Sequence, residues 1–351
     1  MERLRVGIVG AGYWGPNLIR TFVSIPGCEV AGVCDQRPGR LQYIAERFPN
    51  LPLTDRYDDL LADPTVAAVA VATPVSTHRS LAEAALVAGK HVLVEKPLAR
   101  TSVDAYALVR AAERAGRILA TGHVYVYHPA VTALCEAVYS GRFGKLCYAE
   151  SSRVNLGPPA SEVDVIWDLA VHDVSILLSL VNDIPHEVRA EGRRYKHPTF
   201  ADVAFVTLNF ASGFLAQHYV SWLSPVKVRR FFIAGTTGSA TFDDMRDEAK
   251  LLLSDVGEDS RIGAKDTDAR ELFYGPGEIC APSLPAVQPL EVECAHFLEC
   301  IRTGRSPRAD GQSGLVVVQV LEAVARSLAC GGVPIRLEPM RRGMTGTGGT
   351  Y

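Results

Sequence analysis

The stretch Val6–Gly15, VGIVGAGYWG, decides the fold of the first part of this 351-residue chain. Its short apolar run, bounded by glycine, is typical of a buried parallel strand. Three glycines follow in the spacing G-x-G-x-x-G (Gly10, Gly12 and Gly15), and Pro16 opens a segment with apolar residues at helical spacing. A strand, a glycine turn and a helix in this order form a cradle for the pyrophosphate of a dinucleotide at the helix N-terminus.

A carboxylate at the end of the next strand distinguishes this fingerprint from an ordinary glycine-rich turn. The expected strand CEVAGVCD ends on Asp35, twenty residues after Gly15. An acid at this point receives the ribose hydroxyls and favours NAD over NADP. Arg37 can pair with the 2′-phosphate of NADP, so NADP stays open as an alternative. The residues expected to contact the cofactor, here and at later strand ends, are Gly10, Gly12, Tyr13, Trp14, Gly15, Asp35, Gln36, Arg37, Thr73, Pro74, His78, Glu95 and Lys96.

Strands and helices continue to alternate as far as residue 122. The segments VAAVAVATP, HVLVEKP and RILATG are expected strands, with helical segments between them. This alternation predicts a parallel, doubly wound sheet, in which ligands gather outside the carboxyl ends of the strands. Three polar clusters fall at such ends and predict a crevice; they are Thr73–Pro74 with His78, Glu95–Lys96–Pro97, and His123.

The composition excludes several other classes of protein. The net charge is -3, which gives no electrostatic reason to expect nucleic acid or an anionic membrane as partner. No uninterrupted apolar run approaches the roughly 20 residues that a membrane span needs. The eight cysteines are scattered without a metal-binding spacing, so they are interpreted as reduced thiols of a cytoplasmic protein, and no metal site is expected.

Lys96 is a candidate catalytic residue because it ends an apolar strand in the crevice of the fingerprint. An ammonium group there can bind a substrate hydroxyl and stabilise a developing alkoxide. A lysine at a strand end is otherwise a solvated cap. The bond from Lys96 to Pro97 is one that can be cis, which the sequence leaves open.

The segment DVIWDLAVHDVSILLSLV (164–181) predicts a buried helix with one polar stripe. Asp168, His172, Ser175 and Ser179 follow one another at the spacing i, i+4, i+7 and i+11. His172 is the expected proton acceptor, and Asp168 is expected to orient it or to bind a neighbouring substrate hydroxyl. The alternatives are a satisfied core histidine and a metal site, but a third metal ligand is missing nearby.

The second part of the chain predicts a different kind of domain. Short segments with period-2 alternation follow one another between residues 146 and 244, which indicates an antiparallel sheet. Residues 255–289 show little apolar periodicity and are expected to form a surface or substrate-side loop. We therefore expect an NAD(P)-binding domain at 1–122, a substrate-binding and oligomerisation domain at 123–339, and a disordered tail at 340–351. His123, Arg153 and Asn155 join Lys96, Asp168 and His172 as candidate substrate contacts.

Four stretches together resemble the glucose–fructose oxidoreductase / inositol dehydrogenase (Gfo/Idh/MocA) family. They are VGIVGAGYWG, ATPVSTHRSLAEAALVAGKHVLVEKPLA, WDLAVHDVSILL and LEVECAHFLECIRTGRSPRADGQSGLVVVQVLEA. The resemblance implies an N-terminal Rossmann domain and a C-terminal α+β domain with an open, mostly antiparallel sheet. It also implies NAD(P)-dependent oxidation of a sugar or cyclitol hydroxyl by a homodimer or homotetramer. Lys96 matches the lysine of the family's E-K-P motif, while Asp168 and His172 match its D-x-x-x-H pair.

Within the family, SSRVNLGPP and SWLSPVKVRR are most similar to the enzymes that oxidise the 3-hydroxyl of nucleotide-linked sugars, such as UDP-N-acetylglucosaminuronate 3-dehydrogenase. The stretch GEICAPSLPAVQPLEVEC departs from the family pattern. The alternatives are a dehydrogenase of a free sugar, aminosugar, aminoglycoside or inositol, and a 3-ketoreductase that uses NAD(P)H. A protein of another class, a catalytically silent NAD(H)-binding sensor, would keep the glycines and Asp35 but lose the catalytic residues.

Overall fold

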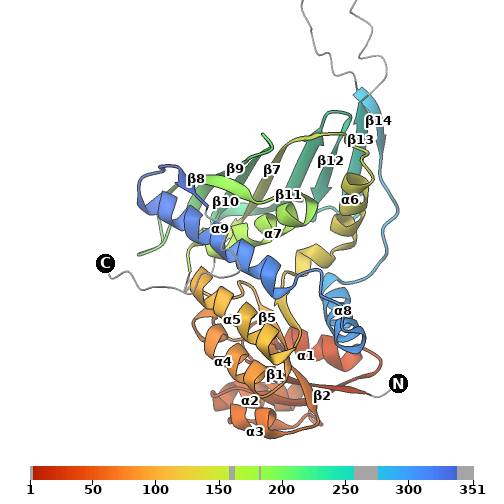
Figure 1. The fold of residues 1–351 in the computed structure, drawn as a ribbon, viewed down its shortest axis with the longest axis vertical. Coiled ribbons are helices and arrows are strands. Elements are labelled where there is room, and N and C mark those ends of the chain that lie inside the picture. Colours follow the sequence, from red (N-terminus) through yellow and green to blue (C-terminus); the bar gives the residue numbers. More distant parts are fainter. Residues whose placement is uncertain (1–2, 158–162, 182, 257–275, 338–351) are drawn as a thin grey trace, which may run out of the picture.

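The computed structural model describes residues 3–157, 163–181, 183–256 and 276–337. Within these residues the chain forms two sheets, one in each half of the molecule (Figure 1). The predicted disordered tail at 340–351 lies outside the described residues.

The first sheet has six strands in the order β3-β2-β1-β4-β5-β6, and all five neighbouring pairs are parallel. This confirms the predicted doubly wound Rossmann sheet. Its strands are β1 (Leu4–Val9), β2 (Cys28–Cys34), β3 (Leu53–Thr54), β4 (Val66–Val71), β5 (His91–Glu95) and β6 (Leu119–Gly122). The helices that connect them are α1 (Gly15–Ser24), α2 (Pro38–Arg47), α3 (Tyr57–Ala62), α4 (Val75–Val87) and α5 (Ser102–Ala115).

Burial explains why these segments adopt their structures. The central strands are mostly apolar because helices cover both faces of a parallel sheet. Helix α1 begins with a proline near its N-terminus and buries Leu18, Ile19 and Phe22, which lie on one side of the helix. The glycine turn before α1 is thereby fixed at the carboxyl end of β1.

The second sheet has nine strands in the order β14-β13-β12-β11-β7-β10-β9-β8-β15 within the described residues. Only the pair β7–β10 is parallel there, so the sheet is mostly antiparallel, as predicted. Its strands are β7 (Leu146–Leu156), β8 (Pro185–Arg193), β9 (Val203–Phe210), β10 (Leu215–Ser221), β11 (Leu223–Gly235), β12 (Gly238–Asp243), β13 (Leu251–Val256), β14 (Pro276–Cys280) and β15 (Ile335–Arg336).

The helices of the second half lie over one face of this sheet, except for α8, which lies beside α1 (Figure 1). They are the 3₁₀ helix η1 (Val124–Tyr127), α6 (Pro129–Tyr139), the π-helical turn η2 (Ile166–Ala170), α7 (Val171–Leu180), α8 (Pro289–Thr303) and α9 (Gly311–Ala329). The other face exposes aromatic side chains in pairs, with ring centroids 5.6 Å apart for Tyr148 and Phe232, and 4.9 Å apart for Phe205 and Tyr219.

The last two helices join the two halves. Helix α9 sends Leu315 and Val318 into the core of the first domain and Val317 and Leu321 into that of the second. Helix α8 falls within the predicted second domain, yet its Phe297 is buried in the core beneath α1. These contacts fix the carboxyl ends of the parallel strands against the second sheet, where a site can form between the domains.

Two sequence expectations differ from the structure. Of the expected loop at 255–289, residues 257–275 lie outside the described residues, and the described part contains the strand β14, whose Ile279 pairs with Ser254 of β13. The segment expected to be a single α-helix begins with the π-helical turn η2, which alters the spacing of side chains between Asp168 and His172. At β14, pairing with β13 overrides the local pattern.

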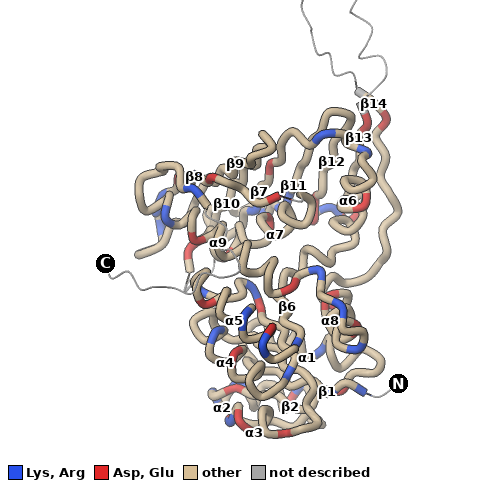
Figure 2. The backbone as a smooth tube through the Cα atoms, in the orientation of Figure 1, with Lys and Arg blue, Asp and Glu red and all other residues tan. Residues whose placement is uncertain are grey.

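Charged residues of both signs are interspersed along the backbone in both halves (Figure 2), as a net charge of -3 suggests. Within the described residues, the helices are too short or too polar to cross a membrane. All eight cysteines are free thiols.

Candidate active site

A cavity of about 1030 Å³ lies where the carboxyl ends of the parallel strands meet the second domain. One wall comes from the loops after β1, β4, β5 and β6, and the other comes from β7, β11, η2 and the start of α7. The predicted crevice is therefore present. The predicted site residues that line it are Tyr13, Trp14, Thr73, Glu95, Lys96, Arg153, Asn155, Asp168 and His172.

The glycine turn has the shape needed to approach the pyrophosphate of a dinucleotide. Gly10 has a φ of 97°, and a Cβ there would lie 2.5 Å from the carbonyl oxygen of Ala72, so only glycine is accommodated. A Cβ on Gly15 would lie 2.1 Å from the carbonyl oxygen of Gly10. At Gly12 the nearest atom would be an Arg37 nitrogen at 3.7 Å. Two glycines thus close the turn, and the third leaves its surface open to a pyrophosphate.

Asp35 lies at the end of β2 with its carboxylate held by two neighbours. Its Oδ2 accepts hydrogen bonds from the Ala11 amide (2.8 Å) and from Nη2 of Arg37 (2.9 Å). Its Oδ1 accepts two more, from Nε of Arg37 (3.0 Å) and from the Arg37 amide (2.9 Å). Burial acts to raise the pKa of Asp35, but the hydrogen bonds from Arg37 and Ala11 hold it below its ordinary value. Asp35 is thus a fixed anion beside the glycine turn, and it keeps Arg37 occupied.

We expect Asp35→Ala to relax the preference for NAD over NADP by about tenfold or more. The change removes the anion that repels a 2′-phosphate and frees Arg37 to bind it. The measurement is the ratio of kcat/KM for the two cofactors. The double variant Asp35→Ala/Arg37→Gln is the control and should lose most of the gain for NADP. An unaltered ratio in Asp35→Ala would mean that this carboxylate does not face the ribose.

Lys96 is oriented by Asp168 across the domain boundary. Its Nζ lies 3.2 Å from Oδ1 and 3.0 Å from the carbonyl oxygen of Asp168, and the bond to Pro97 is cis. The other carboxylate oxygen, Oδ2, accepts a hydrogen bond from Nε1 of Trp222 at 3.1 Å. Both side chains of the ion pair remain partly exposed to the cavity. The ammonium group is therefore fixed in place while keeping one of its three N–H donors for a ligand.

The expectation that Asp168 orients His172 is not met, because both carboxylate oxygens of Asp168 are engaged by Lys96 and Trp222. The π-helical turn that contains Asp168 explains the difference, since it takes that side chain out of the α-helical i, i+4 relation. Ser175 and Ser179, the rest of the expected stripe, donate to helix carbonyls of His172 and Ile176 instead.

His172 faces the cavity as a neutral imidazole. Its ring packs edge-on against Tyr125, with centroids 5.1 Å apart. Burial, and then the positive charges of Lys96 and Arg153, hold its pKa well below its ordinary value. The Nδ1 atom is buried, without a hydrogen-bond partner in the described part of the chain. A neutral imidazole beside a fixed ammonium can take a proton from a hydroxyl while the ammonium stabilises the alkoxide.

This lowered pKa predicts a pH dependence. Because the charged form of His172 is disfavoured, this base is unprotonated at neutral pH. Protonation of His172 should therefore lower kcat/KM for oxidation only when the pH falls below 6.5. Burial raises the pKa of Glu95 to about 7 in the same cavity, so Glu95→Gln is the matched variant in which that titration is removed. An acidic limb with its midpoint above pH 6.5 that persists in Glu95→Gln would contradict this assignment.

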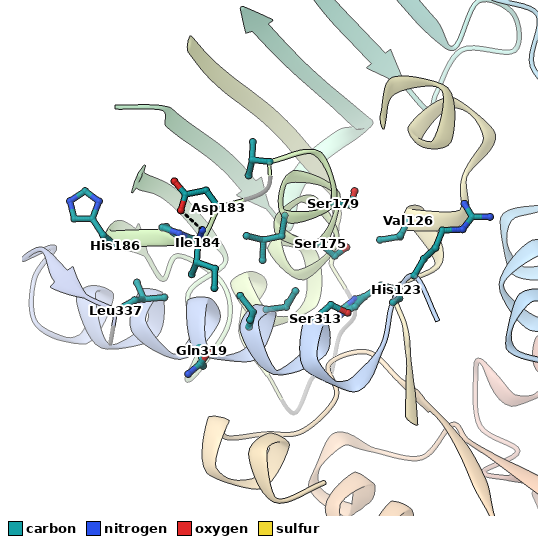
Figure 3. Close-up of a pocket in the computed structure, with 17 residues that line it drawn as sticks. His123, Val126, Ser175, Ser179, Asp183, Ile184, His186, Ser313, Gln319 and Leu337 are labelled. Carbon is teal, nitrogen blue, oxygen red and sulfur yellow. Dashed lines mark hydrogen bonds between the residues drawn. The ribbon is translucent and has the colours of Figure 1, made fainter. Parts of the chain in front are cut away.

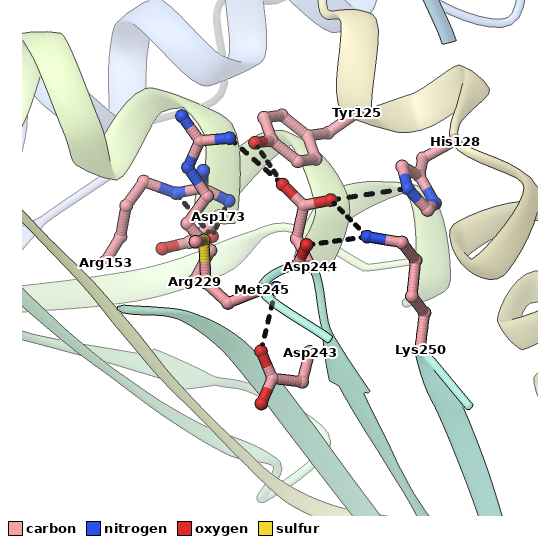
Figure 4. Close-up of polar contacts among 9 residues, drawn as sticks. All are labelled: Tyr125, His128, Arg153, Asp173, Arg229, Asp243, Asp244, Met245 and Lys250. Atoms are coloured by element: carbon pink, nitrogen blue, oxygen red, sulfur yellow. Dashed lines mark hydrogen bonds and ion pairs between the residues drawn. The ribbon is translucent and has the colours of Figure 1, made fainter. Parts of the chain in front are cut away.

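Arg153 lies in the cavity wall, but Asp173 already neutralises it. Its Nε and Nη2 donate to Oδ1 of Asp173 at 3.1 and 2.7 Å, and its guanidinium lies over the Tyr125 ring (Figure 4). Ser151 donates to the other oxygen of Asp173 at 3.0 Å. The side chain is 4% exposed. Arg153 is thus buried and supports Tyr125. It is less available to bind substrate than we expected from the sequence.

Two other predicted contacts lie away from this cavity. His78 bridges two strand-end loops, with its ring nitrogens 2.9 Å from the carbonyl oxygens of Pro97 and Thr73, so it supports the loops from within. His123 lines a second cavity of about 630 Å³ between α7 and α9 (Figure 3). Burial lowers the pKa of His123 to about 3. Neither Pro74 nor these two histidines belong to the lining of the larger cavity.

Sequence reasoning missed several residues of the cavity. Tyr125 lines the cavity and packs against His172, while Trp222, which is not part of the lining, donates a hydrogen bond to Asp168; neither residue belongs to a recognisable motif. The far wall adds a group of charged residues, Lys227, Arg229, Asp244 and Lys250. The alternation of Lys227 and Arg229 along a strand places them on one face, but the sequence alone does not tell which face that is.

A nucleotide-binding Rossmann sheet and a neutral imidazole beside a fixed ammonium define the class of an NAD-binding oxidoreductase. Comparison with known families agrees. Residues 4–123 match the oxidoreductase family with an NAD-binding Rossmann fold, and residues 131–241 match the GFO/IDH/MocA C-terminal domain. The chain belongs to the Gfo/Idh/MocA family of oxidoreductases.

The chain is similar to several characterised members. It is 30% identical over 321 residues to UDP-N-acetylglucosamine 3-dehydrogenase of Acidithiobacillus ferrooxidans, covering 90% of this chain and 94% of the relative. A solved structure of that enzyme has a TM-score of 0.81 at 29% identity, covering 94% and 99% of the two chains. The scyllo-inositol 2-dehydrogenase (NAD(+)) of Bacillus subtilis is 25% identical, covering 98% and 99%. GenD2 from gentamicin A biosynthesis, solved with NAD, has a TM-score of 0.81 at 26% identity, covering 96% and 97%.

Proposed function

We propose that this protein is an NAD-dependent dehydrogenase that oxidises a secondary hydroxyl, at C3, of a pyranose linked to a nucleotide. The observation that carries the proposal is the cavity in which Lys96 and His172 face the carboxyl ends of the Rossmann strands. The similarity to UDP-N-acetylglucosamine 3-dehydrogenase supports the choice of carbon and of substrate class.

The residues divide the chemistry between them. The glycine turn and Asp35 would hold NAD, which would supply the acceptor for a hydride from the sugar carbon. Nζ of Lys96 donates a hydrogen bond to the reacting hydroxyl and stabilises the negative charge that develops on its oxygen. His172 takes the hydroxyl proton as a neutral base. Asp168 and Trp222 hold Lys96 in place, so that little reorientation is needed at the moment of reaction.

A dehydrogenase of an aminoglycoside or an inositol is the second candidate. The similarities to GenD2 and to scyllo-inositol 2-dehydrogenase (NAD(+)) favour it, at identities close to that of the nucleotide-sugar enzyme. The two candidates share the chemistry of Lys96 and His172 and differ in what the rest of the cavity holds. A 3-ketoreductase is the same reaction run in reverse.

The test is NADH formation, followed by absorbance, with UDP- and TDP-hexoses beside the matched free hexoses, aminosugars and inositols. We expect a signal with nucleotide sugars and its loss when the nucleotide is removed. A signal confined to free sugars or cyclitols would overturn the nucleotide-linked substrate while keeping the reaction. Silence with every substrate, and with 3-keto sugars and NAD(P)H, would overturn the proposed reaction.

We also propose that the protein is a homodimer or homotetramer, assembled through the uncovered face of the second sheet. The exposed aromatic side chains on that face support this arrangement, since Phe205 and Tyr148 are 49% and 45% exposed.

A further inference from the structure

The wall of the cavity opposite the Rossmann strands carries more positive charge than negative charge. Lys227 and Arg229 are two residues apart on β11, and Lys250 lies near the start of β13. Among the residues that line this wall, Asp244 is the one carboxylate, and it forms ion pairs with Arg229 and Lys250 (Figure 4). Such an excess inside a concave site attracts an anion.

Asp244 is already saturated. It accepts hydrogen bonds from Tyr125 Oη (3.0 Å) and Arg229 Nη1 (3.0 Å), it forms an ion pair with Lys250 Nζ (3.4 Å), and it lies 3.5 Å from His128 Nε2. Although burial acts to raise the pKa of Asp244, the hydrogen bonds from His128, Arg229 and Tyr125 hold it far below its usual range. One charged carboxylate is therefore shared by two fixed cations and has no capacity left for a third.

Lys227 is the cation of this wall that does not pair with Asp244. It is exposed to the cavity and forms no hydrogen bond or ion pair with any residue that the structure describes. The positive charge of Arg229, and then burial, lower the pKa of Lys227. Two neighbouring cations that repel one another are stabilised when an anion binds between them. Arg229 uses one of its five N–H donors on Asp244 in the described contacts, so its guanidinium can still bind an oxyanion.

We propose that Lys227 and Arg229 form a subsite for an oxyanion carried by the substrate, at the end of the cavity opposite the Rossmann strands. The oxyanion is a phosphate of a nucleotide-linked sugar or the carboxylate of a sugar acid, which share the chemistry that this subsite recognises. The inference rests on the proposed function, because it places the remote part of the same substrate whose hydroxyl lies against Lys96 and His172. The cavity volume of about 1030 Å³ is at the upper end of the range for small-molecule sites, which leaves room beyond a single sugar ring.

Neighbouring residues on the same strand supply a matched control. Arg230 follows Arg229 on β11 and is exposed, and its side chain does not line the cavity. Side chains alternate between the faces of a strand, so Arg230 points to the other side of the sheet. The variants Lys227→Gln and Arg230→Gln each remove one positive charge within a few residues of each other. Any effect of net charge alone should therefore be equal in the two.

The experiment measures binding by calorimetry to the full chain saturated with NADH, for wild type, Lys227→Gln, Lys227→Arg and Arg230→Gln. The probes are UDP, glucuronate and the uncharged sugar N-acetylglucosamine. We expect Lys227→Gln to weaken binding of the anionic probe by about tenfold, Lys227→Arg to restore most of it, and Arg230→Gln to change it by less than about twofold. Binding of N-acetylglucosamine should stay within about twofold in all variants.

The outcomes separate the two sources of the anion. Loss confined to UDP assigns the subsite to a phosphate, and loss confined to glucuronate assigns it to a carboxylate. The subsite is overturned if Lys227→Gln binds both anions as tightly as Arg230→Gln does, or if wild type binds neither anion. Because the readout is binding, a failure of the proposed oxidation would appear separately, as absent turnover with intact anion binding.

Discussion

Replacing His172 by Asn is expected to lower kcat for oxidation by about 10²- to 10⁴-fold while leaving NAD binding unchanged. The imidazole faces the cavity and is kept neutral by burial and by the charge of Lys96. An amide of similar shape keeps the packing against Tyr125 but cannot accept the hydroxyl proton. The loss should therefore appear in the chemical step and not in the affinity for cofactor.

The measurement pairs steady-state kinetics with calorimetric titration of NAD. Ser179→Ala on the same helix is the matched control, because the Ser179 hydroxyl donates to the carbonyl oxygen of Ile176 and lines the second cavity. Its kcat should stay within about twofold of wild type. If His172→Asn retains wild-type kcat, His172 is not the base.

Replacing Lys96 by Met is expected to lower kcat by about 10²- to 10³-fold, as the loss of a fixed donor at a developing oxyanion does. Methionine keeps the length and apolar stem of lysine, but removes the ammonium that lies between the cavity and Asp168. The reacting hydroxyl then loses its stabilising charge in the transition state. Asp168 is partly exposed, so it can be solvated after the change and the fold should survive.

A double-mutant cycle separates a direct role of Lys96 from a structural one. Asp168→Asn alone should cost less than Lys96→Met, because it loosens the ammonium without removing it. If Asp168 acts through Lys96, adding Asp168→Asn to Lys96→Met should lower kcat little further. Fully additive losses would mean that Asp168 acts on the substrate independently. Wild-type turnover in Lys96→Met would remove Lys96 from the mechanism.

The first domain could be predicted from sequence because its signals are local. The glycine spacing, the helix after Pro16 and the acid at Asp35 each reflect a constraint within thirty or so residues. Lys96 was identifiable for a related reason: the carboxyl ends of parallel strands meet at one edge of a sheet, so the position of a strand end indicates the position of its side chain.

The second wall of the cavity could be predicted only in part, because distant residues assemble it. Asp168 and His172 share a helix, and their proximity was expected, but the partner of Asp168 comes from the end of β10 and could not be inferred from helical spacing. Arg153 is a residue type that commonly binds anionic substrates, yet its charge is neutralised by Asp173, twenty residues further along the chain. The spacing of Lys227 and Arg229 places their side chains on one face of a strand, but the sequence does not indicate on which face the cavity lies.

Hydride transfer from the sugar carbon is the step on which the proposed function depends most directly. The decisive measurement uses the substrate found by the NADH assay, prepared with deuterium at C3, and follows the label by mass spectrometry of the NADH formed. We predict that the NADH carries one deuterium and that kcat/KM falls by a primary isotope effect when hydride transfer limits the rate. Turnover that yields unlabelled NADH would contradict oxidation at C3.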